Sequence, residues 1–247
     1  MYGVHGVEGS NPFIPTIGLV LTGPFFYGMI FLGVKLMNKI NYNLEMEKVL
    51  KTIDLNNKPS LLLHSCCGPC SSAVIERLAP FFKLQVLYYN PNIDTYQEYM
   101  KRAEEQIRFI KEFGLEDEVK VQVLDYDKDA FLEAVKGYEH YKEGSARCVK
   151  CFNLRLSKTA ELAKAGNFDY FTTTLSISPW KDSQILNKLG NHLGEIYGVN
   201  YLYSDFKKKD GFKRSVDLSN KFNMYRQCYC GCEFSEEETL KSEKKIN

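Results

Sequence analysis

Eight cysteines are the residues of this sequence whose type and spacing could do chemistry, and they fall into three short groups separated by long stretches without cysteine. They are Cys66, Cys67 and Cys70, then Cys148 and Cys151, and finally Cys228, Cys230 and Cys232. Secreted disulfide scaffolds are usually shorter, and their cysteines are spread to connect loops. Tight groups from distant segments instead indicate thiols that meet at one metal or redox centre of a cytoplasmic protein.

The first group lies in the stretch HSCCGPCSS, which begins at His64, the last residue of the short apolar run SLLLH. We expect this run to be a buried strand and the segment after it to be a helix, so that Cys66 and Cys67 lie on the turn between them. Backbone N–H groups and the dipole at a helix N-terminus favour a thiolate over a thiol. Adjacent cysteines at such a turn can present two sulfurs to one cluster or to neighbouring metals.

The second and third groups are ambiguous when each is taken alone. Cys148 and Cys151 are one helical turn apart and can face one ion or cluster; CxxC pairs occur in zinc ribbons, dithiol redox sites and iron–sulfur proteins. Arg147 and Arg155 could offset the charge of thiolate ligands, or could lie on an exposed helix face. In the third group, a CxC disulfide closes a small, strained and easily reduced ring, which suits a redox relay. Zinc ligation is the competing interpretation of the third group.

The overall composition excludes a strong global preference for nucleic acid. The chain has 247 residues with a net charge of +1, 44% hydrophobic and 26% charged residues, so any basic surface must be local. The stretch FKKKDGFKR could contact phosphates or be a solvated loop. Its basic residues are Lys207, Lys208, Lys209, Lys213 and Arg214. Trp180, the single tryptophan, could stack on a base or pack in the core.

The first 40 residues form an apolar N-terminal extension without a charged residue between positions 9 and 34. The length of this extension could span a bilayer, and Lys35 and Lys39 follow it as a stop signal would. Alternatively, translation begins at Met37 or Met46 and the upstream stretch is not part of the protein. We therefore expect membrane attachment only if this segment is real, and we expect residues 41–247 to form a single α/β catalytic domain with a cysteine-rich C-terminal segment.

Strands and helices alternate along the rest of the chain. Apolar runs predict strands at 60–64, 84–93, 119–127, 170–175 and 200–206, with amphipathic helices between them. This alternation predicts a Rossmann-like parallel sheet with helices on both faces. Ligands of such sheets bind beyond the carboxyl ends of the strands, where residues 64–70, 90–94 and 172–179 should meet.

Three helix starts are predicted from capping residues. We expect Ser71 to cap the helix after the first cysteines, Thr95 with Glu98 to form a capping box, and Ser178 with Pro179 to begin the helix after the fourth strand.

Five stretches, in the same order over about residues 44–234, carry a resemblance to a known family. They are LLLHSCCGPCSSAVIERL, NPNIDTYQEYMKR, RCVKCFNLRL, FDYFTTTLSISPWKD and DGFKRSVDLSNKFNMYRQCYCGC. Together they resemble the cobalamin-independent epoxyqueuosine reductases. The resemblance implies an oxidoreductase that removes the epoxide oxygen of epoxyqueuosine at the wobble position of tRNA to give queuosine. It also implies a fold similar to the nucleotide-binding α/β units of other tRNA-modifying enzymes.

The resemblance also implies a ligand set for a [4Fe-4S] cluster. In this sequence the matching residues are Cys66, Cys67, Cys148 and Cys151. Cys70 belongs to the first motif of the family and could bind an additional iron ion beside the cluster.

The same resemblance implies that Cys230 and Cys232 form a redox-active disulfide, whereas Cys228 is an addition to the RQxYCGC pattern and a bystander. Because the sequence has no GxGxxG fingerprint for a flavin or nicotinamide, we expect electrons from an external donor. Candidate proton donors by position are His64, Asp94 and Tyr229. Two other functions stay open: a zinc-stabilised tRNA-binding module and a thiol–disulfide oxidoreductase.

Overall fold

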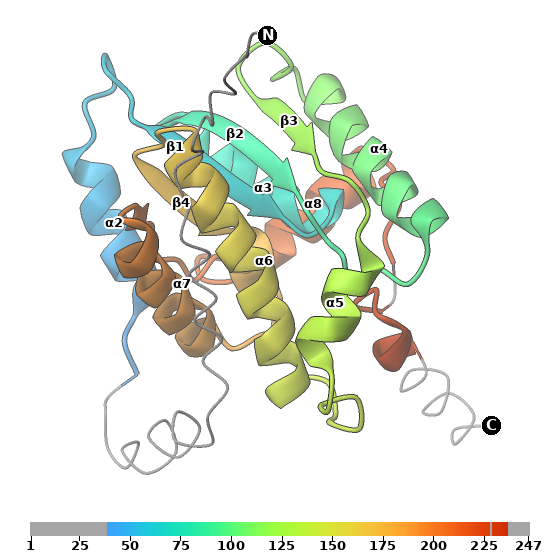
Figure 1. Ribbon diagram of the computed structural model, residues 1–247. Helices are drawn as coiled ribbons and strands as arrows, with labels where there is room; N and C mark the ends of the chain where they lie inside the picture. Colours follow the sequence, from blue (N-terminus) through green and yellow to red (C-terminus); the bar gives the residue numbers. More distant parts are fainter. Residues whose placement is uncertain (1–38, 228, 237–247) are drawn as a thin grey trace, which may run out of the picture. The chain divides into compact units, whose positions relative to one another are not determined.

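Five parallel strands form the centre of the structure, a computed structural model that describes residues 39–227 and 229–236 (Figure 1). The strands are β1 (Ser60–Ser65), β2 (Lys83–Tyr88), β3 (Lys120–Val123), β4 (Tyr170–Thr173) and β5 (Asn200–Tyr201). Their order in the sheet is β3-β2-β1-β4-β5, and every neighbouring pair is parallel. The predicted α/β class with a parallel sheet is confirmed. The predictions for the N-terminal extension and for Cys228 concern residues outside this description.

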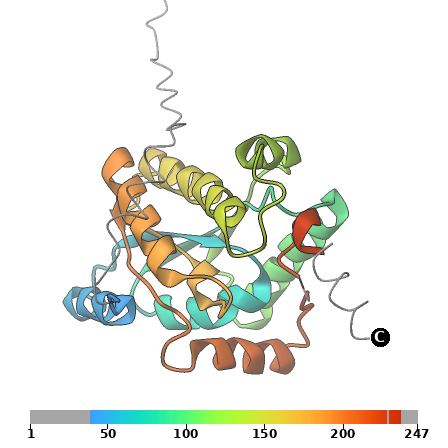
Figure 2. The same ribbon diagram turned by 90° about the horizontal axis from the view of Figure 1, so that it is seen from below.

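Helices cover both faces of the sheet, as predicted (Figure 2). They are α2 (Tyr42–Thr52), α3 (Gly68–Leu78), α4 (Tyr96–Glu112), α5 (Lys128–Val135), α6 (Ala146–Ala165), α7 (Ser183–Tyr197) and α8 (Gly211–Lys221), with a short 3₁₀ helix, η1 (Thr174–Ile177). None of the helices in the described part of the chain is long and apolar enough to cross a membrane.

The side chains of β1 show how the two faces are filled. Leu61 and Leu63 enter one apolar cluster, which includes residues of α3, α4 and α8 such as Ile75. Leu62, between them, enters a second cluster with residues of α6 and α7 such as Leu156. Successive side chains of a strand point to opposite faces, so a continuous apolar run belongs in a strand that is covered on both sides. The run SLLLH meets this description, because β1 is the central strand.

The order in which strands are added to the sheet reverses at β1. The chain first moves outward from β1 through β2 to β3, and then returns to the other side of β1 to add β4 and β5. Such a reversal leaves a crevice outside the carboxyl ends of the two strands at which it occurs, here β1 and β4. The turn that follows β1 carries the first cysteine group. The fold therefore places the cysteines where open α/β sheets bind their ligands.

Two of the three predicted helix starts are wrong. Helix α3 begins at Gly68 with Cys67 as its N-cap, because Pro69 is preorganised for the first turn, and Ser71 lies inside the helix with its hydroxyl donating to the carbonyl of Gly68. Ser178 ends η1 instead of capping a helix. Helix α7 begins at Ser183, and Asp182 supplies its cap.

The third start is confirmed, since the Thr95 side chain accepts a hydrogen bond from the Glu98 backbone N–H at the start of α4. The last strand is only two residues long, and the second half of the basic stretch 206–214 begins α8, which was not predicted.

Candidate functional site

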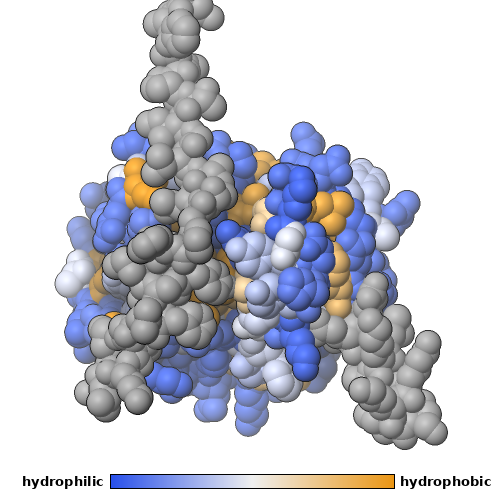
Figure 3. Space-filling model, turned by 60° about the horizontal axis from the view of Figure 1, so that its bottom comes forward, coloured by the Kyte–Doolittle hydropathy of each residue, from blue (hydrophilic) through white to orange (hydrophobic). Residues whose placement is uncertain are grey.

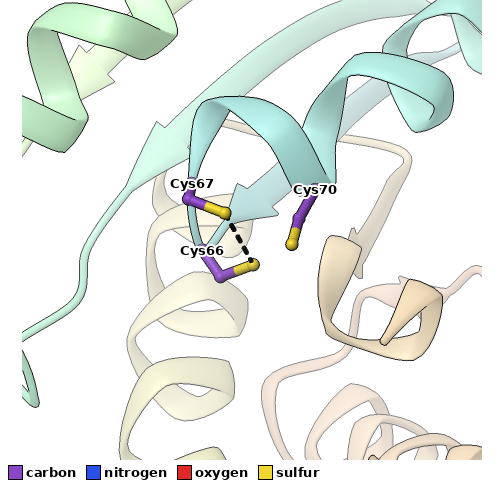
Figure 4. Close-up of side chains that lie close together, drawn as sticks. All are labelled: Cys66, Cys67 and Cys70. Atoms are coloured by element: carbon purple, nitrogen blue, oxygen red, sulfur yellow. Dashed lines mark hydrogen bonds between the residues drawn. The ribbon is translucent and has the colours of Figure 1, made fainter. Parts of the chain in front are cut away.

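The first cysteine group forms a compact cluster of thiols on the β1–α3 turn. The sulfurs of Cys66 and Cys67 are 3.9 Å apart, and the sulfurs of Cys66, Cys67 and Cys70 all lie within 4.8 Å of one another. Figure 4 shows the three side chains pointing toward one another at the start of α3. Three thiols at this separation can share one soft metal ion or form part of the ligand set of a larger cluster.

Neighbouring strand ends hold the turn in place. The backbone N–H of Cys66 donates to Oγ1 of Thr174 over 3.1 Å, and this hydroxyl lies 3.4 Å from the Cys66 sulfur. On the other side, Nδ2 of Asn90 donates to the carbonyl of Ser65 over 2.9 Å. Thr174 follows β4 and Asn90 follows β2, so the predicted meeting of three strand ends at one edge is confirmed.

The three thiols differ in pKa: that of Cys66 is lowered, and those of Cys67 and Cys70 are raised. Hydrogen bonds from Cys67 and Cys70 hold the pKa of the Cys66 thiol well below its usual range, with Lys181 and Thr174 acting in the same direction. The interaction with Cys66 raises the pKa of Cys67 to about 12, and it also raises the pKa of Cys70. The first thiolate of the group therefore forms at Cys66, and the other two thiols donate to it.

A cavity of about 500 Å³ opens beside the cysteine turn. Cys66, Cys67 and Cys70 line it together with Cys230 from the C-terminal segment. The first cysteine group and Cys230, which are about 160 residues apart in the sequence, therefore face one space. The charged residues of its wall are Arg155, Lys181, Arg226 and Glu143. Three positive side chains against one negative side chain suit an anionic ligand or the charge of metal-bound thiolates.

Two further cysteines lie together in a separate apolar cluster. Cys151 of α6 and Cys232 are both buried and pack with Phe131 and Val135 of α5. Burial raises the pKa of Cys151 to about 11 and that of Cys232 to about 12. Cys148 is half-buried, and its sulfur accepts a hydrogen bond from the Gly144 backbone N–H over 3.2 Å. The second cysteine group thus lies close to the third group as well as to the cavity wall.

Arg155 connects the cysteine groups electrostatically. It is 2% exposed, and its guanidinium donates to the Asn90 side chain over 3.3 Å and to the Cys151 carbonyl over 3.4 Å. Burial by itself lowers the pKa of Arg155, but the charges of Cys151, Cys230, Cys66 and Cys148 outweigh it and raise the pKa. Of the two predicted positions for this arginine, the structure supports the one that offsets thiolate charge. Arg147 is also buried, with its guanidinium 4.8 Å from the Phe234 ring.

Arg102, which the sequence did not single out, contacts residues 229–231 of the C-terminal segment. Its guanidinium is 5.3 Å from the Tyr229 ring and 3.5 Å from the Cys230 carbonyl. A Cβ on Gly231 would lie 2.9 Å from its Nη1. Arg102 is 2% exposed and is paired with Glu98 at 2.7 Å. The sequence contained one signal for its burial: Arg102 is three residues after Tyr99 and directly before Ala103, so it falls on the buried face of α4.

The three candidate proton donors differ in their positions. His64 is fully buried and both ring nitrogens have partners, Thr173 at 2.9 Å and the Tyr89 carbonyl at 3.1 Å. Burial lowers the pKa of His64 to about 4, so it holds the strand ends together as a neutral ring. Tyr229 lines the cavity, and its hydroxyl donates to Asp94 over 3.3 Å.

Of the five basic residues predicted to contact phosphates, three are paired with acidic side chains in the described part of the chain and two are not. Lys207 is turned inward and paired with Asp205 at 2.8 Å. Lys209 is paired with Glu47 at 3.0 Å, and Arg214 makes two hydrogen bonds to Glu76 at 2.6 and 2.8 Å. The two remaining lysines of the stretch are exposed and make no ion pair with another described residue. They are Lys208 and Lys213.

The family model for "Epoxyqueuosine reductase QueH" matches residues 61–238 of this chain, well over half of its length. The chain belongs to this family. An epoxyqueuosine reductase QueH of Streptococcus pyogenes serotype M1 is 41% identical over 200 residues, covering 80% of this chain and 78% of that protein. QueH of Staphylococcus aureus strain Mu50 is 39% identical over 80% of this chain and 84% of its own. QueH of Thermotoga maritima is 35% identical over a match that covers 71% of this chain and 90% of that protein.

The QueH match includes all eight cysteines of the chain. Among solved structures, the U34-tRNA thiolase NcsA of Methanococcus maripaludis with its [4Fe-4S] cluster has a TM-score of 0.47 and 14% identity, over 81% of this chain and 72% of its own. A similarity at this level adds nothing to the assignment of the site.

Proposed function

We propose that this QueH-family chain reduces epoxyqueuosine in the wobble position of tRNA to queuosine. One observation carries the proposal beyond family membership: the first cysteine group and Cys230 line the same cavity of about 500 Å³. A reaction that needs both a metal site and a source of two electrons requires these two groups to reach one substrate. A purely structural metal site would not need a redox thiol in the same open space.

The reaction can be balanced with the cysteines of the chain. Both C–O bonds of the epoxide break, a second bond forms between the two carbons, and the oxygen leaves as water. This change consumes two electrons and two protons. The thiols of Cys230 and Cys232 supply both and become a disulfide. An external donor of two electrons and two protons, whose identity is open, then returns the disulfide to two thiols.

We further propose that Cys66, Cys67, Cys148 and Cys151 hold a [4Fe-4S] cluster, and that Cys70 serves an additional iron ion. The residues present fit these groups, because cysteine sulfurs, once deprotonated by metal binding, are the soft donors that iron–sulfur clusters take. The buried Arg155 guanidinium lies where it would offset part of their negative charge. A bound cluster would supply single-electron transfer, and an iron with an open position would supply a Lewis acid for the epoxide oxygen.

Two other side chains of the cavity have roles in this scheme. Burial by itself lowers the pKa of Lys181, but the charges of Cys230, Cys66 and Cys70 outweigh it, so the ammonium keeps its proton beside the thiolates. Burial, together with the nearby Asp94 carboxylate, raises the pKa of Tyr229. Tyr229 therefore keeps its phenolic proton at the cavity wall. We propose that it passes this proton to the departing oxygen and takes a replacement from the Cys230 thiol, so that the two protons consumed still come from the thiol pair.

Anaerobic purification followed by iron, sulfide and zinc analysis tests the proposal together with an assay on tRNA that carries epoxyqueuosine. We expect a brown protein with iron and sulfide, and queuosine among the nucleosides released from the tRNA after reaction with a chemical reductant. A colourless zinc protein that binds tRNA without forming queuosine would instead support the zinc-stabilised binding module. A metal-free protein that exchanges disulfides with small thiols would support the thiol–disulfide oxidoreductase.

A further inference from the structure

Trp180 is the most exposed large apolar side chain of the described residues, and it lies at the cavity. Its exposed fraction is 82%, although tryptophan is usually largely buried in folded proteins. It lies in the segment between η1 and α7, where its backbone N–H donates to the Ser178 hydroxyl over 3.3 Å. Ser178, Trp180 and Lys181 all line the cavity. The indole therefore stands in solvent on a segment whose neighbours face the cysteines.

The cavity wall also contributes a second aromatic side chain and a cation. Phe212 at the start of α8 and Arg226 both line the cavity. The Arg226 guanidinium lies 5.6 Å from the Phe212 ring and 3.3 Å from the Ser219 hydroxyl. Exposed aromatic rings beside cations are the combination with which proteins bind unpaired nucleotides: the ring stacks on a base and the cation meets the phosphate. Most of the described surface that is visible in Figure 3 is hydrophilic, with smaller hydrophobic areas between.

We propose that Trp180 is the stacking platform for the base of the wobble nucleotide in a single-stranded anticodon loop, while Arg226 meets its phosphate backbone. The inference rests on the proposed function and deepens it. A base that is stacked between its neighbours has no free face, so the wobble nucleotide must leave the stack in order to lie on the indole. Stacking on Trp180 replaces the contacts that the base loses. The substituent that carries the epoxide then extends from the base into the cavity toward Cys66 and Cys230.

A double-mutant cycle tests this contact: the indole of Trp180 and the wobble base are removed separately and together, and the losses of binding affinity are compared. The probe is a fluorescein-labelled anticodon stem-loop with guanine at the wobble position, and a second stem-loop is abasic there. Fluorescence anisotropy gives the Kd of each for the purified full-length protein, for Trp180→Ala and for Trp180→Phe. Ile196→Ala is the matched control, because Ile196 is 59% exposed but lies at the far end of α7, about 20 Å along the helix from Ser183.

We expect Trp180→Ala to weaken binding of the guanine stem-loop by about 5- to 150-fold, the range for one stacked base. Trp180→Phe should retain part of the affinity, and Ile196→Ala should bind like the unsubstituted protein. The abasic stem-loop should lose the same factor with the unsubstituted protein, and no further factor with Trp180→Ala. Because the chain has one tryptophan, binding of the guanine stem-loop should also change the indole emission.

Two results would overturn the inference. One is a Kd for Trp180→Ala within about twofold of the unsubstituted protein, the usual error of such cycles. The other is full additivity of the two losses, which would mean that Trp180 and the wobble base do not touch. Failure of the proposed function gives a different result, because the unsubstituted protein, which has Trp180, would then form no queuosine. If queuosine forms and Trp180→Ala leaves KM for tRNA unchanged, only the role of Trp180 is wrong.

Discussion

The first cysteine group of this chain and Cys230 of the last group face one cavity, but the structure holds them in different ways. Cys66 and Cys67 continue the central strand, and backbone pairing with β2 and β4 fixes the turn that carries them. Cys230 and Cys232 belong to no strand. The Gly231 carbonyl accepts from the Asp94 N–H over 2.9 Å, and the Cys232 carbonyl accepts from the N–H groups of Ser235 and Glu236 over 3.0 and 3.1 Å. The backbone of Cys230 is held by side chains, those of Arg102 and Ser235.

This difference matches the two kinds of chemistry that we propose. A metal ligand must keep one position, and a turn between a central strand and a helix supplies it. A thiol pair that alternates with a disulfide must change its backbone, and a glycine between the cysteines allows that change. Gly231 has φ +114°, a conformation that other residues rarely adopt. The comparison therefore predicts that substitutions in the two groups have separable effects.

The largest effect should follow from removing a sulfur of the proposed cluster. We expect Cys66→Ser, Cys67→Ser, Cys148→Ser and Cys151→Ser each to lose most of the iron and the activity, because serine is a poor ligand for iron in such clusters. Iron and sulfide analysis of each variant measures this. Full iron loading of Cys148→Ser would remove Cys148 from the ligand set.

A different pattern should follow in the last group. Cys230→Ser and Cys232→Ser should retain iron and the visible spectrum but fail to turn over repeatedly, because one thiol cannot form the internal disulfide. Steady-state queuosine formation and iron content are measured on the same preparation. Loss of iron in Cys232→Ser would make Cys232 a ligand beside Cys151, with which it packs.

A smaller effect should follow from disturbing the contact between Gly231 of the last group and Arg102. Gly231→Ala would place a Cβ 2.9 Å from Nη1 of Arg102 at a positive φ, a strain of about 1–3 kcal/mol. We expect turnover to fall about tenfold or more, since 1.4 kcal/mol reduces the population of the productive arrangement tenfold. Gly137→Ala is the matched control, with φ +82° but nothing within 4 Å of the added Cβ. Equal losses in both variants would show that Arg102 is irrelevant to turnover.

The smallest effect concerns tRNA. Because Lys207, Lys209 and Arg214 have acidic partners, we expect only Lys208→Gln and Lys213→Gln to flatten the salt dependence of binding, by about 0.7–0.9 in log–log slope per lost contact. Binding titrations at several salt concentrations measure it. Lys120→Gln, at the opposite edge of the sheet, should leave the slope unchanged. An unchanged slope in both test variants would make the stretch a solvated loop.

The first group could be predicted from sequence because every step was local or topological. An apolar run gave the strand, alternation gave the parallel sheet, and the sheet placed Cys66 at its carboxyl edge. The last group could not be placed in this way. Its position depends on Arg102, which is 128 residues from Cys230. The capping errors at Ser71 and Ser178 have a similar cause: Gly68 and Pro69 started one helix early, and η1 used the residues expected to cap the other.

The central claim is that the last cysteine group delivers the two electrons, and one measurement tests it directly. The reduced enzyme reacts once with tRNA carrying epoxyqueuosine, without any added reductant. Free thiols are then alkylated, and the cysteine peptides are identified by mass spectrometry. We predict one new disulfide for each queuosine formed, confined to Cys230 and Cys232. Queuosine formation with both residues alkylated as free thiols would contradict the account and require another path for the electrons.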